Sequence, residues 1–247
     1  MQHIQPKDLI IIDIETAPVL PDFDSLSEEW KTLWEEKIQY SLPEGVTPSG
    51  FFPRRAGIMA EFARIVCISM AYLTNEDHRL RMRVKSFYGF EEKEILQQFL
   101  ATVNKIEAHN KRWCFAGHNI KEFDIPFICR RLLINQLTIP RYLDFQNMKP
   151  WETNIVDTFQ YWRFGDYKNF TSLKLLAAAM GVPSPKDDID GSMVGPLFWN
   201  GTMEERKINL ERIANYCQKD VIATGNILLR FKNLPLLNEE DIEIVKD

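Results

Sequence analysis

Residues 9–16 have the sequence LIIIDIET, an apolar run that contains two acidic side chains. Such a run is typical of a buried β-strand, and residues two apart in a strand point to the same face of the sheet. Asp13 and Glu15 therefore project together from the end of an apolar strand. Because unpaired charge in apolar surroundings is costly, the pattern predicts a buried strand whose two acids face a compensating cation.

Two later segments place further polar side chains in apolar surroundings. Residues 115–128, FAGHNIKEFDIPFI, contain Asp124, and residues 213–224, IANYCQKDVIAT, contain Tyr216 and Asp220. Tyr216 and Asp220 lie four apart in a helix-like stretch, so they share a face of that helix. If the segments converge in the fold, their carboxylates form an oxygen-rich site for two hard divalent ions, Mg²⁺ or Mn²⁺.

The order of these segments resembles the DEDD superfamily of 3′→5′ exonucleases, which includes the proofreading domains of DNA polymerases. The resemblance is carried by Asp13-x-Glu15, by Asn119 with Phe123-Asp124, and by Tyr216-x-x-x-Asp220. A tyrosine four residues before the last aspartate is typical of the tyrosine variant, the DEDDy subgroup. The histidine variant would have a histidine where Asn215 stands.

Within that superfamily, the chain is most similar to stand-alone predicted exonucleases related to the proofreading domain of family B DNA polymerases. The similarity rests on IDGSMV at residues 189–194 and on YCQKDVIATGNILLRF at residues 216–231, and it spans residues 8–231. It implies an α/β, ribonuclease-H-like fold in which helices flank a mixed central sheet. The order of elements, with strands first and helices interleaved later, favours the same class.

The resemblance also implies a role for each acidic residue and for the tyrosine. Asp13 is expected to bridge two metal ions, and Asp124 to serve the second of them. Glu15 and Asp220 are expected to complete the site that holds the attacking water. Tyr216 would orient that water rather than remove its proton, because an ordinary tyrosine pKa is about 10. The expected catalytic set is Asp13, Glu15, Asp124, Tyr216 and Asp220, and its four carboxylates are the expected metal ligands.

Three residues are expected to contact the last nucleotides of a substrate, namely Thr16, Asn119 and Phe123. An aromatic face can stack on a base without choosing its identity, although core packing is an equally good interpretation of Phe123. His118 has no histidine partner, and Asp157 either lies near the metal ions or simply ends a strand. We leave both out of the expected catalytic set.

The charge of the chain limits the kind of nucleic acid that it can bind. A net charge of −5 argues against sequence-blind coating of a duplex, which requires a basic face. It does not exclude a nuclease, because several acids belong to the expected metal site. A short path for a single strand would need basic side chains, and the candidates are Arg54, Arg55, Arg64, Lys111, Arg112 and Lys168. For any one of them, an ordinary solvated surface charge is the favoured interpretation.

Neither a membrane segment nor a secretion signal is expected. No apolar stretch approaches the roughly 20 residues that span a bilayer, and the start, MQHIQPKDL, lacks the regions of a signal peptide. The four cysteines form no C-x-x-C pair, which is typical of buried thiols in a reducing compartment. We therefore expect a cytoplasmic protein.

The rest of the chain predicts one domain, residues 1–247, with its core at about 8–231. Strands are expected at 9–14, 64–74, 79–88, 112–119 and 154–158, and helices at 26–40, 91–106, 122–136, 171–181 and 202–231. Ser25 or Ser27 would cap the helix at 26–40. Residues 42–53 and 182–195 are expected to be loops, and the acidic residues 235–247 to be loosely held. The roles of the insertion at 20–62 and of the loop at 185–195 are left open.

These observations favour a 3′→5′ exonuclease that acts on single-stranded ends and releases nucleoside 5′-monophosphates. A non-catalytic nucleic-acid-binding module is the alternative from another class, but such a module is expected to have lost a metal carboxylate, and none is lost here. Similarity to proofreading domains favours DNA over short RNA, although a pocket that senses the 2′-hydroxyl cannot be recognised in a sequence. Proofreading in trans, DNA repair and end trimming are all compatible, and no protein partner is indicated.

Overall fold

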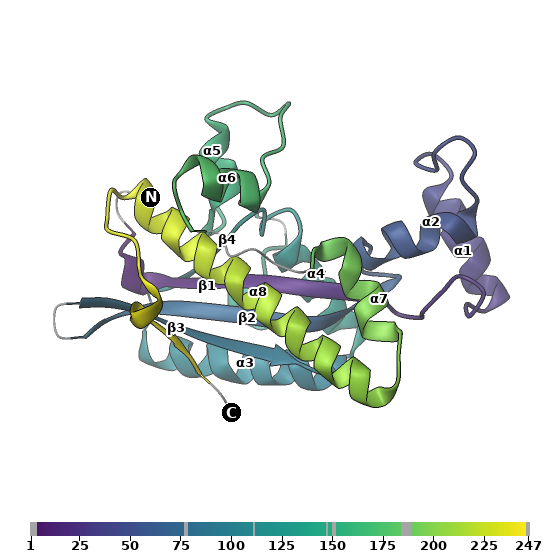
Figure 1. The fold of residues 1–247 in the computed structure, drawn as a ribbon, viewed down its shortest axis with the longest axis horizontal. Helices are drawn as coiled ribbons and strands as arrows, with labels where there is room; N and C mark the ends of the chain where they lie inside the picture. Colours follow the sequence, from purple (N-terminus) through teal and green to yellow (C-terminus); the bar gives the residue numbers. More distant parts are fainter. Residues whose placement is uncertain are drawn as a thin grey trace.

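The computed structural model describes residues 4–76, 79–110, 112–146, 148–149, 152–183 and 189–245 of the chain. Within them, a six-stranded mixed sheet with the order β5-β4-β1-β2-β3-β6 forms the centre of the molecule (Figure 1). The strands are β1 (Leu9–Pro18), β2 (Ala63–Glu76), β3 (Arg79–Tyr88), β4 (Cys114–Gly117), β5 (Ile155–Asp157) and β6 (Ile242–Ile244). β2 runs antiparallel to β1 and β3, whereas the β1–β4, β4–β5 and β3–β6 pairs are parallel.

Helices of very different length surround this sheet. They are α1 (Glu28–Ile38), α2 (Pro48–Arg55), α3 (Glu92–His109), α4 (Asp124–Ile134), α5 (Thr158–Arg163), α6 (Leu173–Ala179), α7 (Val194–Trp199) and α8 (Met203–Phe231). Short 3₁₀ turns are η1 (Pro6–Asp8), η2 (Ala56–Ile58), η3 (Arg141–Leu143), η4 (Gly191–Met193) and η5 (Glu239–Asp241). None of the helices in the described ranges combines the length and hydropathy that crossing a bilayer requires.

The sheet is covered on both faces, α3 lying against one and the long α8 crossing the other (Figure 1). Ile12 of β1 belongs to the core on the α3 side, and Ile11 to the core on the α8 side. Because side chains alternate along a strand, Asp13 and Glu15 face the α8 side. The expected mixed sheet flanked by helices is confirmed.

Most of the predicted elements are present, and capping side chains fix the start of several helices. Ser27, rather than Ser25, caps α1, its hydroxyl accepting a hydrogen bond from the backbone N–H of Trp30. Thr202 and Glu205 form a reciprocal capping box at the start of α8. β1 extends to Pro18 rather than ending at residue 14, so the two acids lie inside the strand.

The loop predicted at residues 42–53 is wrong, because α2 begins within it. Thr47 caps this helix by accepting from the backbone N–H of Gly50, and Pro48 occupies its first turn. Proline suits that position, since its fixed φ is helical and its missing N–H would have had no partner there. The proline that indicated a break therefore marks the start of a helix.

Residues 19–62 form a helical arm between the neighbouring strands β1 and β2. The arm contains α1, α2 and η2, and it projects beyond the end of β1 (Figure 1). It has a core of its own, in which the ring of Trp34 lies 5.1 Å from those of Phe52 and Phe62. Val19 donates its backbone N–H to the carbonyl of Phe62 at 2.9 Å, which closes the base of the arm.

The prediction that the acidic end of the chain, residues 235–247, is loosely held is wrong for its described part. β6 pairs with β3, and Leu237 is buried. Arg79 forms an ion pair with Glu240 at 2.6 Å, and Arg83 one with Glu243 at 2.7 Å. The tail therefore adds a strand to the edge of the sheet, because its acids meet the arginines of β3.

The loop predicted at 182–195 is described only in part, since residues 184–188 lie outside the described ranges. Its C-terminal end forms η4 and the start of α7, a helix that the sequence did not predict. Phe198 of α7 is buried, and the indole N–H of Trp199 donates to the carbonyl of Pro18 at 2.8 Å. This segment is thereby held against the end of β1.

Candidate active site

Asp13 and Glu15 share one face of β1. Glu15 is 7% exposed, and Asp13 is half-buried. The register of β1 with β2 shifts between Glu15 and Thr16, so an irregularity interrupts the ladder directly after the second acid, and the pairing then continues to Pro18. The predicted pair is thus presented from the middle of the sheet, where solvent compensates its charge poorly.

Asp124 is brought to this pair by a hydrogen bond from the backbone of β1. The backbone N–H of Ile14, which lies between the two acids, donates to Asp124 Oδ1 at 3.0 Å. Asp124 is the first residue of α4 and is 3% exposed. A helix N-terminus favours a negative charge, so the helix supports this carboxylate in its buried position.

Tyr216 and Asp220 come from α8, on the face that covers β1. The Tyr216 hydroxyl is hydrogen-bonded to Asp220, and burial is the largest cause that raises the pKa of Tyr216. The charges of Asp220, Glu15 and Asp13 raise it further. All five residues of the expected catalytic set therefore lie within electrostatic reach of one another.

The carboxylates of this cluster are difficult to ionise without a cation. Burial raises the pKa of Asp13 well above its ordinary value, and the charges of Asp124, Asp220 and Glu15 raise it further. The pKa of Glu15 is also raised well above its ordinary value, mainly by burial and then by the charge of Asp220. For Asp124, burial raises the pKa to about 7, although the hydrogen bond from Ile14 opposes the rise.

Cys217 is a member of the site that the sequence did not indicate. Its Sγ lies 3.3 Å from Asp13 Oδ2 and 3.4 Å from the Asp13 carbonyl oxygen. Possible ligand atoms of Asp13, Glu15 and Cys217 all lie within 4.8 Å of one another, a group that includes neither Asp124 nor Asp220. The expected burial of this thiol is correct, but its contact with Asp13 depends on how α8 packs on β1.

The three residues expected to contact substrate differ in their surroundings. The Thr16 hydroxyl donates to the carbonyl of Gly57 at 2.6 Å, so it ties the helical arm to β1. Asn119 has a left-handed backbone with φ of 63°, and its buried Oδ1 has no partner among the described residues. Phe123 packs partly on the core, 5.4 Å from the ring of Phe127, and also lines a cavity beside Glu15.

Asp157 and His118 organise the segment that carries Asn119. The Asp157 carboxylate accepts hydrogen bonds at 3.0 Å from the backbone N–H groups of Asn119, Lys121 and Phe159. His118 Nε2 lies 3.0 Å from the carbonyl oxygen of Thr171, which it can reach only as a donor. Among the described contacts, neither side chain touches Asp13 or Glu15. The contacts of Asp157 and His118 instead hold the backbone around Asn119 in place.

The mixed sheet, its flanking helices and the acidic cluster on β1 define an α/β domain of the ribonuclease-H-like class. Residues 58–242 match the family described as predicted 3′-5′ exonucleases related to the exonuclease domain of PolB, and the chain belongs to this family. The matched residues include Asp124, Tyr216 and Asp220, whereas β1 and most of the helical arm precede them.

A solved structure agrees with this class at the level of the fold. The family B DNA polymerase from the hyperthermophilic archaeon Pyrobaculum calidifontis is similar with a TM-score of 0.53 and 16% sequence identity. The match covers 91% of this chain and 25% of the polymerase, so the chain spans about a quarter of that protein's length. No curated protein matches the chain significantly.

Proposed function

We propose that the protein is a metal-dependent 3′→5′ exonuclease that removes nucleoside 5′-monophosphates from single-stranded nucleic acid, with DNA favoured. The observation that carries the proposal is the convergence of Asp13, Glu15 and Asp124 beside Tyr216 and Asp220. The Ile14–Asp124 hydrogen bond and the Cys217–Asp13 contact hold these segments together. Membership of a family of predicted 3′-5′ exonucleases supports the polarity.

The donor set fits Mg²⁺ or Mn²⁺. These hard ions prefer carboxylate oxygens, and the raised pKa values of Asp13, Glu15 and Asp124 are those of buried acids whose charge lacks compensation. No ion pair joins these three acids to a basic side chain within the described part of the chain. Asp13, Glu15, Asp124 and Asp220 would hold two ions, which when bound supply Lewis acidity and a lowered pKa of water.

The residues around the carboxylates place the substrate and the attacking water. The pKa of Tyr216 lies above its ordinary value, so its hydroxyl stays protonated at neutral pH and orients water instead of deprotonating it. Phe123 offers an aromatic face to the terminal nucleotide. The partnerless Oδ1 of Asn119 is an acceptor that a donor brought by the substrate would satisfy.

Two further proposals concern the substrate and the domain. DNA is favoured over short RNA because the family is described by its relation to the exonuclease domain of PolB. We also propose that the chain acts as one domain, since the helical arm is tied to β1 by Thr16 and the tail pairs with β3.

The test is degradation of matched single-stranded DNA and RNA with Mg²⁺ or Mn²⁺, each labelled at its 5′ end to follow the ladder and, in a parallel reaction, at its 3′ end to follow the released nucleotide. We expect a descending ladder from the DNA, release of mononucleotides, and no activity in EDTA. A closed circular single strand, which has no 3′ end, is the control and should stay intact. Equal activity in EDTA would exclude the metal-dependent mechanism, and cuts in the circle would identify an endonuclease. Binding without any hydrolysis would favour the non-catalytic module.

A further inference from the structure

A cavity of about 620 Å³ lies directly beside the carboxylate cluster. It is lined by Glu15 and Phe123, by the helical arm with Arg54 and Ile58, and by the η4–α7 segment. Sites that bind small organic ligands typically measure about 300–1,000 Å³, a range that includes a single nucleotide. The cavity thus joins the proposed reaction centre to an element that the family match scarcely covers.

The arm holds its wall in a fixed place. Its aromatic core around Trp34 supports α2, which carries Arg54. The hydrogen bond from Thr16 to the carbonyl of Gly57 then fixes the turn η2, which carries Ile58, to the strand that bears Glu15.

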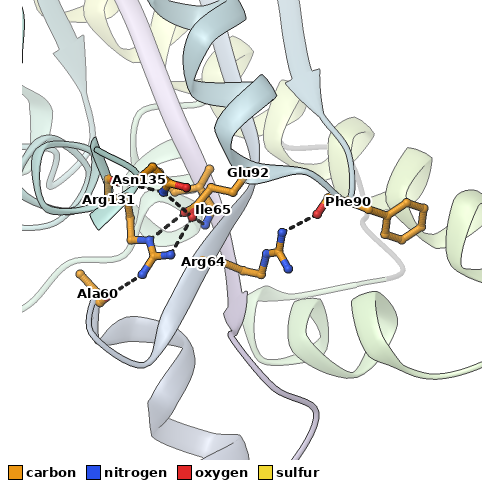
Figure 2. A network of polar contacts seen from close by, with 7 residues as sticks. All are labelled: Ala60, Arg64, Ile65, Phe90, Glu92, Arg131 and Asn135. Atoms are coloured by element: carbon orange, nitrogen blue, oxygen red, sulfur yellow. Dashed lines mark hydrogen bonds and ion pairs between the residues drawn. The ribbon is translucent and has the colours of Figure 1, made fainter. Parts of the chain in front are cut away.

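The base of the arm is fixed by a buried ion pair (Figure 2). Arg131 of α4 donates to the two carboxylate oxygens of Glu92 at 2.8 and 2.6 Å, and to the carbonyl of Ala60 at 2.8 Å. Glu92 also accepts from the backbone N–H of Ile65 at 2.7 Å. Arg131 and Glu92 are 6% and 4% exposed, so the connection between the arm, α3 and α4 is shielded from solvent. The arm and the strand that bears Glu15 are therefore parts of one packed unit.

The chemistry of the cavity suits a nucleotide. Among the described residues that line it, Glu15 and Arg54 are the charged ones. Arg54 is exposed, and its guanidinium forms no hydrogen bond or ion pair with another described residue, so it is available to a phosphate. Ile58 is 46% exposed although it is a large apolar side chain, and with Phe123 it offers surface to a base or sugar.

The neutral polar groups of the cavity are already engaged. The Thr16 hydroxyl donates to Gly57, and the Ser192 hydroxyl donates to Asp190 at 2.5 Å. No described lining residue is an asparagine or glutamine, the side chains that read base edges through paired hydrogen bonds. Recognition in this cavity is therefore expected to depend on phosphate charge and apolar contact, not on base identity.

We propose that the helical arm forms one wall of the pocket for the 3′-terminal nucleotide, with Arg54 binding a phosphate of the strand and Ile58 packing against the terminal nucleoside. The inference rests on the proposed exonuclease function and adds its substrate-binding element. Arg54 supplies positive charge beside a cluster of acids that would otherwise repel the backbone of the strand. Because these contacts involve no base edge, strands that end in any of the four bases are bound alike.

The test compares Arg54→Ala with Arg55→Ala. Arg55 is the neighbouring exposed arginine and does not line the cavity, so its substitution controls for the general loss of charge from the arm. The probe is a short single-stranded DNA with a fluorescent 5′ end, whose anisotropy is measured in EDTA over a series of salt concentrations. Arg54→Ala should weaken binding about tenfold, near the lower limit for a hydrogen bond to a charged group. The negative slope of log affinity against log salt should become shallower by about 0.7, the value for one single-strand phosphate contact.

Two further variants separate charge from packing. Arg54→Lys keeps the charge and should retain the salt slope. Ile58→Ala should weaken binding while leaving that slope unchanged, because it removes apolar contact and changes no charge. In turnover with Mg²⁺, Arg54→Ala should raise KM and leave kcat nearly unchanged, and the wild type should bind strands ending in any of the four bases alike.

Equal affinities and salt slopes for Arg54→Ala and Arg55→Ala, in a wild type that degrades DNA, would overturn the role of the arm and leave the exonuclease proposal intact. A wild type that degrades no strand with either metal would overturn the exonuclease proposal and this one with it.

Discussion

The buried carboxylate of Asp124 allows a direct test of the metal site through stability. Burial raises the pKa of Asp124 from an ordinary value of 3.8 to about 7. A carboxyl whose folded pKa is raised contributes stability at low pH, and that contribution is lost as the pH rises through the folded value. Without metal, the protein should therefore become less stable between about pH 4 and pH 8.

The size of this loss of stability follows from the change in the pKa of Asp124 on folding. The difference between an ordinary pKa of 3.8 and a folded value of about 7 corresponds to about 4 kcal/mol at 1.36 kcal/mol per unit. Asp124→Asn removes the charge and keeps an Oδ1 that can still accept the hydrogen bond from Ile14. The variant should thus be more stable than the wild type at pH 8 in EDTA, by up to about 4 kcal/mol.

The assay is urea denaturation in EDTA at about pH 5 and about pH 8, which yields the free energy of unfolding. The difference should shrink to about 1–2 kcal/mol at the lower pH, because the folded wild type is protonated there while its unfolded chain is still ionised, and it should vanish only below about pH 4. Adding Mg²⁺ or Mn²⁺ at pH 8 should reverse the order, because an ion that binds only the folded state stabilises it and needs the lost carboxylate.

Two results would refute this reasoning. If Asp124→Asn is the less stable protein at pH 8 in EDTA, burial does not destabilise the ionised form of this carboxylate. If both proteins gain equally from the metal, Asp124 does not take part in binding it. The pH dependence that remains in the variant should come from Asp13 and Glu15, whose pKa values are also raised.

Three further predictions concern catalysis and the base of the arm. Tyr216→Phe keeps the ring and its packing, so the protein should melt normally while turnover falls by up to about 10²–10⁴-fold; full activity would leave Tyr216 a packing residue. Asp13→Ala should abolish detectable hydrolysis in a folded protein, as checked by circular dichroism, and robust activity would contradict the assignment of the site. Arg131→Met should destabilise the protein by about 3–5 kcal/mol in urea, because it leaves Glu92 as a buried, uncompensated charge. Arg130→Met, at the exposed neighbouring position, is its control, and equal midpoints would show that the ion pair contributes nothing.

Local patterns were sufficient to predict much of the architecture. The apolar run at residues 9–16 specified β1, and hydrophobic spacing specified α8. These predictions held because their cause lies within a few residues of the element itself. The same local patterns selected Asp13 and Asp220 as candidates, although no short segment contains more than two of the expected carboxylates.

Where local signals admit more than one outcome, the packing decided. Pro48 could mark a break or a helix start, and it starts α2 because Phe52 of that helix is buried in the core of the arm. The composition of the acidic tail predicted a loosely held segment. The tail is held because it contacts the arginines of β3, as in the pair of Arg83 and Glu243, which are 160 residues apart. From the sequence, Asp157 either lay near the metal ions or simply ended a strand. In the structure its carboxylate accepts the hydrogen bond that holds the turn at Asn119.

The sequence by itself determined five of the six strands, the long helices and the identities of the acids, since each depends on the spacing of neighbouring residues. Only the tertiary structure decided that the acids form one site. Ile14 and Asp124 are separated by 110 residues, and Cys217 and Asp13 by 204, yet both pairs are in contact. The raised pKa values and the cavity wall at Arg54 have the same origin, because burial and proximity are created only when distant segments pack together.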